Sequence, residues 1–529
     1  MRTFNTTGPC TPSKHYMVDP SEKVGQIKAM VDRGKYFTIN RARQYGKTTT
    51  INWLSRCLGQ DYDVLKLNFQ RISSASFETE EGFIQAFCRQ VLARGRALSI
   101  PDNVKSQLRD YASRERNKVV FDELFSTLSD WCGESEKPIV MVIDEVDAAT
   151  NNQVFLDFLA QLRTDYLERT DDPTYGTFRS VILVGVTDVK HLKAKIRPEE
   201  EGRQNSPWNI ATDFLVDMSL SEEGIKGMLD EYEADHHTGM DTVAVARSVH
   251  EWTNGYPFLV SRICQLVDES VSKEMPPDRS WTSRGINEAV KLILSERNTL
   301  FDSLTKNLND YPKLKASIRT VLMEGAILPW NPDLEDIARM QMYGLIENFE
   351  NTVRIDNRVF ETRLYNLFLS DERLRNSAFA REGGLARNMF VRDGRLDVRL
   401  VLERFVVTYT QVKGPLKEPF KERDGREDFL LFLKPIINVT GNYYIEAQTR
   451  DEKRTDVIVD CLGQQYVIEL KIWHGERHDA EGERQISAYL DYWNLDVGYM
   501  LSFNFDKRKK EQGVRRVQVA DKVLFEAMV

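Results

Sequence analysis

Residues 36–49 restrict the possible folds of this chain more than any other stretch; they read Tyr-Phe-Thr-Ile-Asn-Arg-Ala-Arg-Gln-Tyr-Gly-Lys-Thr-Thr. A short apolar strand leads into a tight loop, and Gly46, Lys47 and Thr48 open an amphipathic helix that should end near Gly59. Backbone N–H groups at such a helix N-terminus bind anions, and lysine and threonine at these positions reach the phosphates and Mg²⁺ of a nucleotide. The pattern therefore predicts a phosphate-binding loop.

One position departs from the usual pattern of such loops. The first glycine, five positions before Gly46, is Arg41 in this chain. The alternative interpretation is an ordinary strand–helix turn with a solvated lysine. On the phosphate-loop interpretation, the residues expected to contact nucleotide are Arg43, Gln44, Tyr45, Gly46, Lys47, Thr48 and Thr49.

Composition limits the class of protein. The chain has 529 residues, of which 41% are hydrophobic and 29% charged, as expected for a globular protein of several domains. A net charge of −9 argues against nonspecific coating of nucleic acid, so any such contact must come from local basic patches. The six cysteines lack CxxC spacing, and no long apolar run or signal peptide is found. We therefore expect a cytoplasmic protein without membrane attachment.

A second stretch supports nucleotide hydrolysis. Residues 138–143 form a continuous apolar run, typical of a parallel strand that is buried on both faces. The run ends in Asp144 and Glu145. A hydrolytic phosphate-loop site needs one acid for Mg²⁺ and a neighbouring base for the attacking water. We assign these two roles to Asp144 and Glu145, which gives an ATPase.

Further strands are expected at 64–69, 180–188 and 214–218, separated by helical patterns. Alternating strands and helices predict an α/β fold with a doubly wound parallel sheet and a ligand at the strand C-termini. Thr187, at the polar tip of the 180–188 run, either senses the γ-phosphate or simply ends the strand.

The chain resembles AAA-like ATPases of the additional-strand catalytic-glutamate group. The segments 206–211 (Ser-Pro-Trp-Asn-Ile-Ala) and 254–262 (Asn-Gly-Tyr-Pro-Phe-Leu-Val-Ser-Arg) are similar to bacterial and archaeal members that have a helical lid. The resemblance implies that Arg262 of the lid contacts nucleotide; the alternative is that it pairs with an acid on the lid surface. It also suggests Arg197 as a finger acting on a neighbouring subunit, and hence a homo-oligomer.

The middle of the chain changes character. Helical patterns at 314–322 and 334–340 precede two short extended runs, 343–347 and 353–356, spaced as in a hairpin. Helices with a small hairpin resemble a winged helix, which binds DNA or a partner, or couples domains. Because this hairpin is not basic, we favour coupling. The charged, glycine-containing stretch 371–393 is interpreted as a linker.

A second set of carboxylates lies in the C-terminal third. Period-two alternation in the run 466–472 puts Glu469 and Lys471 on one face, and a hairpin with the run 454–459 would bring Asp456 near Glu469. Two acids and a lysine can hold Mg²⁺ and orient a water for phosphodiester cleavage. The alternative is a Glu–Lys salt-bridge ladder on a solvated face.

The flanking residues favour the nuclease interpretation. Glu427 lies on an upstream helical pattern and Gln485 on a downstream one. This order resembles PD-(D/E)XK nucleases over residues 427–505, with Thr455 in place of the proline of the motif. The resemblance implies Mg²⁺ or Mn²⁺ held by Asp456 and Glu469. It implies the catalytic set Glu427, Asp456, Glu469, Lys471 and Gln485, added to the ATPase base Glu145.

Taken together, these patterns predict an ATP-binding and ATP-hydrolysing protein that controls a metal-dependent nuclease acting on DNA. Such fusions resemble defence systems against phage or mobile elements. The alternatives are a nucleotide-sensing scaffold whose nuclease-like domain only binds nucleic acid or a partner, and an ATP-driven DNA motor. The stretch 507–516, with six basic residues and one acid, is the best phosphate-backbone patch. The predicted domains are an ATPase core at 1–220, a helical lid at 221–300, a winged-helix-like domain at 301–378, a linker at 379–394 and a restriction-endonuclease-like α/β domain at 395–529.

Overall fold

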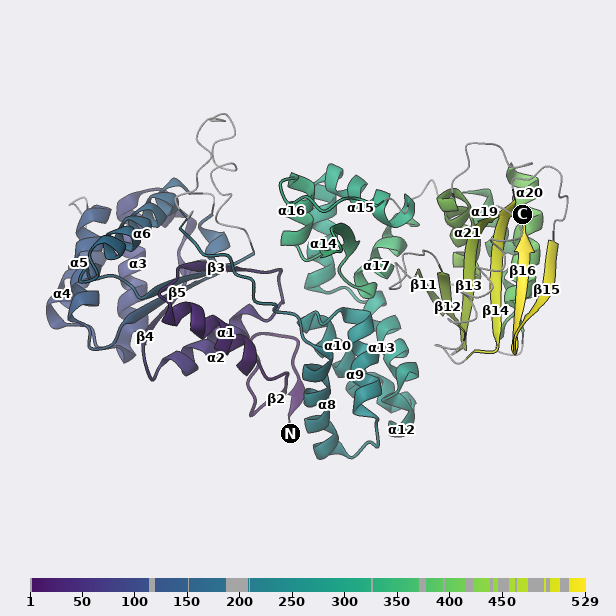
Figure 1. Ribbon diagram of the computed structural model, residues 1–529, viewed down its shortest axis with the longest axis horizontal. Helices are drawn as coiled ribbons and strands as arrows, with labels where there is room; N and C mark the ends of the chain where they lie inside the picture. The colour runs from purple at the N-terminus through teal and green to yellow at the C-terminus, as the bar shows by residue number, and fades with distance from the viewer. Residues whose placement is uncertain are drawn as a thin grey trace. The chain divides into compact units, whose positions relative to one another are not determined.

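In the computed structural model, the chain folds into two compact units (Figure 1). The first unit comprises residues 1–250, 255–270 and 341–344, and the second comprises 251–254, 271–340 and 345–529. Among the described helices, none is long and apolar enough to cross a membrane. The structure describes residues 2–113, 119–150, 152–186, 208, 210–324, 327–370, 377–392, 395–413, 422–437, 441–445, 456–461, 464–473, 490, 495–504 and 513–529.

The first unit is built on a parallel sheet. Its strands are β3 (Phe37–Asn40), β4 (Asp63–Asn68), β5 (Ile139–Asp144) and β6 (Ser180–Gly185). They lie in the order β3-β6-β5-β4, and every pairing is parallel. The prediction of an α/β fold with a parallel sheet is confirmed. The C-terminal ends of these strands share one edge, which is where α/β sheets bind ligands.

Helices cover both faces of this sheet. Figure 1 shows α1 and α2 on one face and α3, α5 and α6 on the other. The helices are α1 (Ser21–Asp32), α2 (Lys47–Leu58), α3 (Glu80–Arg94), α4 (Asp102–Ser113), α5 (Phe121–Glu134) and α6 (Gln153–Asp171).

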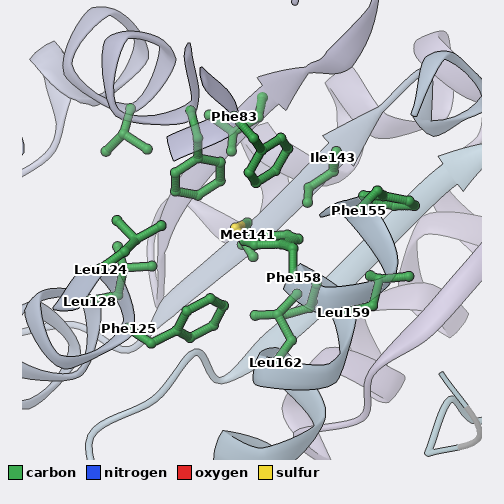
Figure 2. Close-up of a cluster of buried hydrophobic side chains, with 14 of the residues drawn as sticks. Phe83, Leu124, Phe125, Leu128, Met141, Ile143, Phe155, Phe158, Leu159 and Leu162 are labelled. Carbon is green, nitrogen blue, oxygen red and sulfur yellow. The ribbon is translucent and has the colours of Figure 1, made fainter. Parts of the chain in front are cut away.

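Strand β5 shows why its sequence is continuously apolar. Met141 and Ile143 face a core shared with Phe83 and Phe158, as Figure 2 shows. Val142 faces the opposite core, which includes residues of α1 and α2. Because successive side chains of a strand point to opposite faces, both sets must be apolar. Burial of each such side chain contributes about 1.5–3 kcal/mol.

The predicted fifth strand, 214–218, is wrong. A single parallel bridge joins Thr212 to Phe37, and the sheet as described then has four strands. Phe214 stacks on Phe37 with ring centroids 6.0 Å apart, whereas Leu215 is 88% exposed. The Val216 carbonyl accepts a hydrogen bond from a side chain, the Arg41 guanidinium. This side-chain bond takes the place of a strand ladder at Val216.

Three further helices follow the sheet: α8 (Glu222–His236), α9 (Thr242–Thr253) and α10 (Pro257–Leu266). The N-terminal strands β1 (Thr3–Phe4) and β2 (His15–Tyr16) pair in parallel and contact α10 and α8. Phe4 and Tyr16 each lie 5.2 Å from the Tyr232 ring, measured between centroids. An aromatic cluster therefore holds the N-terminal segment on the helices of the predicted lid.

The second unit begins with helices and a hairpin. The strands β7 (Ile346–Phe349) and β8 (Thr352–Ile355) are antiparallel, as the sequence predicts, and a two-residue turn joins them. Glu350 and Asn351 in this turn have φ of 48° and 63°, the left-handed backbone of tight hairpins. The helices are α11 (Ser272–Glu274), α12 (Pro277–Ser280), α13 (Ser283–Ser295), α14 (Thr299–Asp310), α15 (Pro312–Glu324), α16 (Glu335–Met342) and α17 (Arg358–Phe368).

A mixed sheet forms the C-terminal part of this unit. Its order is β11-β12-β13-β14-β16-β15 (Figure 1). The strands are β11 (Gly441–Ile445), β12 (Asp456–Cys461), β13 (Gln464–Trp473), β14 (Val497–Asn504), β15 (Gly513–Val519) and β16 (Lys522–Met528). Helices α20 (Val398–Lys413) and α21 (Glu422–Ile437) contact it, and Tyr409 of α20 lies 5.7 Å from the ring of Phe503 in β14.

The segment expected to be a linker contains a packed helix. Helix α19 (Ala378–Phe390) contacts α20 and α21, and the short strands β9 (Val391–Arg392) and β10 (Arg395–Leu396) follow it. A Cβ atom at Gly383 would lie 2.1 Å from the Phe432 carbonyl oxygen of α21. The glycine that suggested a linker instead permits close contact between two helices.

We expect Gly383→Ala to destabilise the second unit by about 1–3 kcal/mol, because backbone must shift to admit the methyl group. Gly384→Ala is the matched control. Its Cβ would meet Pro435 at an ordinary 3.8 Å, and alanine favours a helix over glycine by about 1 kcal/mol. Calorimetry and hydrogen exchange of α19 and α21 measure both effects. Equal stability of the two variants would contradict the close helix contact.

Candidate functional site

The predicted phosphate loop joins β3 to α2. Gln44 and Gly46 both have left-handed backbone, with φ of 59° and 78°, and Gly46 is the N-cap of α2. The Arg41 N–H donates to the Gly185 carbonyl of β6 at 3.2 Å, which fixes the start of the loop on the sheet. The first N–H groups of α2 thus lie at the C-terminal edge of the sheet, where they can bind an anion.

Lys47 folds back over the loop. Its Nζ donates to the carbonyl oxygens of Arg41 at 2.8 Å and Ala42 at 2.9 Å. Burial lowers the pKa of Lys47, and the carboxylates of Asp147, Glu145 and Asp144 oppose that shift. The ammonium group is therefore held beside the loop, close to the acids at the end of β5.

Arg41, which replaces the usual glycine, points away from the loop centre. Its guanidinium donates to the carbonyls of Asn40 at 3.0 Å and Val216 at 2.9 Å, and lies 5.3 Å from the Phe214 ring centroid. Burial lowers the pKa of Arg41, opposed by Tyr45 and Asp217. The larger side chain thus binds the 214–218 segment to the start of the loop.

Asp144 and Thr48, both predicted Mg²⁺ ligands, are brought together. Asp144 is 3% exposed, and the Thr48 side chain is near enough to lower its pKa. Burial raises the pKa of Asp144, and the Lys66 ammonium is the strongest influence opposing this shift. An oxygen-rich pair of this kind is the donor set that Mg²⁺ prefers. The described residues here fit a Mg²⁺–nucleotide.

Glu145, the predicted base, follows in a strained backbone conformation with φ of 56°. Burial raises the pKa of Glu145, and the negative charge of Asp144 raises it further. A carboxylate with a raised pKa is a better proton acceptor near neutral pH. Its left-handed backbone turns the chain from β5 into the short helix η4 (Val146–Ala148).

Sequence reasoning missed Asp147. Its Oδ2 accepts a hydrogen bond from the Val186 N–H at 2.7 Å and contributes to the electrostatic environment of Lys47. A Cβ atom at Gly185 would lie 2.7 Å from Val146, so β6 and η4 are tightly packed. Its position in the sequence, two residues after Glu145, could have indicated that Asp147 belongs to the site. Thr187 and Arg197 lie outside the described residues.

Helix α10 contacts the loop through its first turn. The Tyr256 hydroxyl donates to the Arg43 carbonyl at 2.6 Å, and the Tyr45 and Tyr256 rings meet edge to face at 4.7 Å. A Cβ atom at Gly46 would lie 3.9 Å from Pro257. The sequence singled out this segment but assigned its role to Arg262, so Tyr256 was missed.

Thr49 and Arg262, two other residues predicted to contact nucleotide, lie near the N-terminal segment. The Thr49 hydroxyl accepts from the Cys10 N–H at 3.0 Å. Arg262 Nη1 donates to Gln265 Oε1 at 2.7 Å, and the Thr6 hydroxyl lies 3.2 Å from the same oxygen. Arg262 is thus tied to its own helix, and its contact with nucleotide stays a prediction.

In the second unit, β12 and β13 are antiparallel with Asp456 opposite Glu469. Lys471 follows on the same face of β13 by strand alternation. Glu469 is 4% exposed, and residues 466–470 are all buried, which disagrees with a ladder on a solvated face. The predicted juxtaposition of these three positions agrees with the backbone register.

Of the remaining predicted nuclease residues, the structure describes Glu427. Glu427 lies on α21, and its Oε1 is 3.5 Å from Arg319 Nη2. Gln485 and Thr455 lie outside the described residues. Among the side chains that the structure describes, no three of His, Cys, Asp or Glu are grouped as a metal site. The Asp456 side chain is not one of the described side chains. By donor chemistry, the carboxylates at 456 and 469 suit a hard cation.

The parallel sheet and its phosphate loop define an AAA-like P-loop ATPase domain. The family model described as "AAA-like domain" matches residues 7–371, more than half of the chain. The protein belongs to this family. Residues beyond 371, which hold the candidate nuclease positions, lie outside the match.

Other similarities are weaker. An uncharacterised WD repeat-containing protein of Synechocystis sp. is 24% identical over 258 residues, 45% of this chain, and the match spans only 20% of that protein. The Walker-type ATPase of Pyrococcus abyssi aligns over 68% of this chain and 99% of its own, with 12% identity and a TM-score of 0.47. Cdc6p of Pyrobaculum aerophilum aligns over 70% and 98%, with 13% identity and a TM-score of 0.33.

Arg41→Ala should loosen the 212–218 segment and lower the stability of the first unit by about 1.5–3 kcal/mol, the usual range for hydrogen bonds to charged groups. Arg43→Ala is the control, because the Arg43 side chain is exposed. Hydrogen exchange of peptides covering 212–218 measures the effect. If both variants exchange like the wild type, the Arg41 guanidinium does not hold this segment.

Proposed function

We propose that the protein binds and hydrolyses ATP and thereby controls a metal-dependent nuclease in its C-terminal part. The observation that carries the nuclease proposal is the pairing of Asp456 with the buried Glu469 on adjacent strands, with Lys471 on the same face. DNA is the proposed substrate, and defence against phage or mobile elements is the proposed setting.

For ATP, residues 43–49 would hold the phosphates, and Lys47 would supply the counter-charge. Thr48 and Asp144 would hold Mg²⁺, which when bound neutralises phosphate charge. Glu145 would accept a proton from the attacking water, and its raised pKa suits that role. Thr187 and Arg262 are proposed as further nucleotide contacts.

For the nuclease, Asp456 and Glu469 would hold Mg²⁺ or Mn²⁺, which when bound lowers the pKa of a water. Lys471 would stabilise the charge that develops on the phosphodiester. Glu427 and Gln485 complete the set that the resemblance to PD-(D/E)XK nucleases implies.

Control by ATP is proposed to start at α10. Tyr256 contacts the Arg43 carbonyl, and Pro257 lies near Gly46. The segment 341–344 also touches the loop, because a Cβ atom at Gly344 would lie 2.8 Å from the Ala42 side chain. Phosphates bound by the loop would change these contacts, and the homo-oligomer expected for AAA-like proteins would extend the change to neighbouring subunits.

A nucleotide-sensing scaffold is the second candidate, favoured by Arg41 in place of glycine. It predicts ATP binding with no useful hydrolysis and no cleavage. A DNA motor, the third candidate, predicts ATP hydrolysis stimulated by DNA. Steady-state ATPase assays with and without DNA separate these candidates from a switch.

Lys47→Ala should abolish ATP binding, because it removes the phosphate counter-charge. Glu145→Gln should retain binding but lower hydrolysis by about 10²–10⁴-fold, because an amide accepts no proton. Isothermal titration and phosphate release measure the two steps. Hydrolysis at the wild-type rate by Glu145→Gln would remove Glu145 as the base.

Asp456→Ala and Glu469→Ala should each eliminate cleavage of plasmid or linear DNA with Mg²⁺ or Mn²⁺ while leaving ATP hydrolysis nearly intact, because distant sites are usually independent. Lys471→Ala should also eliminate cleavage but spare metal binding. Lys47→Ala should change the cleavage rate by about tenfold, equivalent to about 1.4 kcal/mol of coupling.

RNA incubated in parallel identifies the substrate class. Cleavage that survives Asp456→Ala would contradict the nuclease assignment. Cleavage by Lys47→Ala at the wild-type rate, with and without ATP, would leave a nuclease but remove ATP control.

A further inference from the structure

One peptide group at the end of β6 joins two parts of the candidate ATPase site. Its carbonyl oxygen, on Gly185, accepts a hydrogen bond from the Arg41 N–H at 3.2 Å. Its N–H, on Val186, donates to Asp147 Oδ2 at 2.7 Å. Arg41 begins the phosphate loop, whereas Asp147 lies in η4, which follows the predicted base Glu145. This peptide group therefore connects the loop to the segment that carries Glu145.

Packing around this peptide group leaves little room for movement. Gly185 is buried, and a Cβ atom there would lie 2.7 Å from the Val146 side chain and 3.1 Å from Asp147 Oδ2. The Thr150 hydroxyl donates to the Asp147 carbonyl at 3.0 Å, which holds the backbone of η4 from its other side. The Asp147 carboxylate thus forms a hydrogen bond between η4 and the sheet at a tightly packed point.

The contacts continue from the start of the loop to Lys47. The Arg41 carbonyl accepts a hydrogen bond from Lys47 Nζ at 2.8 Å. Burial lowers the pKa of Lys47, and Asp147 is the acid that opposes this shift most strongly. Asp147 therefore acts on the site in two ways, through its hydrogen bond to Val186 and through its negative charge near Lys47.

We propose that Asp147 is a positioning residue for ATP hydrolysis, which holds Glu145 in place beside the phosphate loop through its hydrogen bond to the Val186 N–H. The inference rests on the proposed ATPase and extends it to a residue outside the predicted catalytic and nucleotide-binding set. In this role Asp147 acts through the backbone of η4 and contacts neither the nucleotide nor the attacking water.

The backbone of Glu145 explains why such support is needed. Its φ of 56° is unfavourable for a residue other than glycine and persists only where neighbouring contacts hold it. Loss of the hydrogen bond to Val186 would let η4 and Glu145 shift together. A displacement of a catalytic group by about 1 Å lowers a rate by about 100-fold. Binding of ATP depends instead on the first N–H groups of α2 and on Lys47, so hydrolysis should fall while affinity is retained.

The competing explanation is that Asp147 acts only through its charge on Lys47. Two conservative substitutions separate the explanations. Asp147→Asn removes the charge but keeps a side-chain oxygen of the same reach, which accepts a hydrogen bond from the Val186 N–H. Asp147→Glu keeps the charge but adds a methylene group beside the tightly packed Gly185, so its carboxylate cannot take the same position.

The test measures ATP affinity by isothermal titration and kcat by phosphate release, with the full-length protein and with rates normalised to the titrated number of binding sites. Asp147→Asn should keep kcat within about threefold of the wild type, whereas Asp147→Glu and Asp147→Ala should lower it at least tenfold. The Kd for ATP should change less than threefold in all three variants. Asp157→Ala is the matched control, because it removes an exposed acid of α6 whose carboxylate contacts Gln153 of the same helix at 2.8 Å. It should change neither quantity.

If Asp147→Ala does not fold, the comparison of Asp147→Asn with Asp147→Glu decides the test. Wild-type kcat in Asp147→Glu, a kcat in Asp147→Asn as low as that in Asp147→Glu, or a loss of affinity as large as the loss in kcat overturns the inference. In each of these cases the proposed ATPase stands, provided that the wild type hydrolyses ATP and Glu145→Gln does not. A wild-type protein that hydrolyses no ATP would reject both the ATPase and the role of Asp147.

Discussion

Burial of strand β5 on both faces is the constraint on which the first unit depends. Met141 and Ile143 close one core and Val142 the other, so the strand cannot shift by one residue without moving every side chain to the wrong face. The fixed register places Asp144 at the strand end beside Thr48. The candidate nucleotide site is therefore positioned by apolar packing, with its polar groups concentrated where the strand leaves the core.

The sequence predicted those parts of the fold in which the local residue pattern agrees with the packing in the folded protein. Continuous apolar runs became β5 and β6, and the hairpin predicted between residues 454–459 and 466–472 has Asp456 opposite Glu469. The failures have tertiary causes. The 214–218 run reads as a strand, but the guanidinium of Arg41, distant in sequence, binds its Val216 carbonyl.

The same distinction applies to α19 and to the candidate sites. Gly383 and its charged neighbours are typical of a linker when read locally, yet the glycine is required by the close approach of Phe432, about fifty residues later in the printed sequence. Tyr256 lay within a segment that the sequence singled out, but its contact with the Arg43 carbonyl depends on how α10 meets the loop. Roles that depend on spacing along one element were predictable; roles that depend on packing between elements were not.

The buried carboxylates of the two units have different basic partners. Around Asp144 the basic partners are lysines; burial lowers the pKa of both Lys47 and Lys66, and the nearby acids oppose this shift and favour the charged ammonium groups. Around Glu526 the partner is an arginine, which keeps its charge when partly buried and remains half exposed. The Glu526–Arg515 pair is formally neutral, whereas the site of the first unit gathers two lysines beside Asp144.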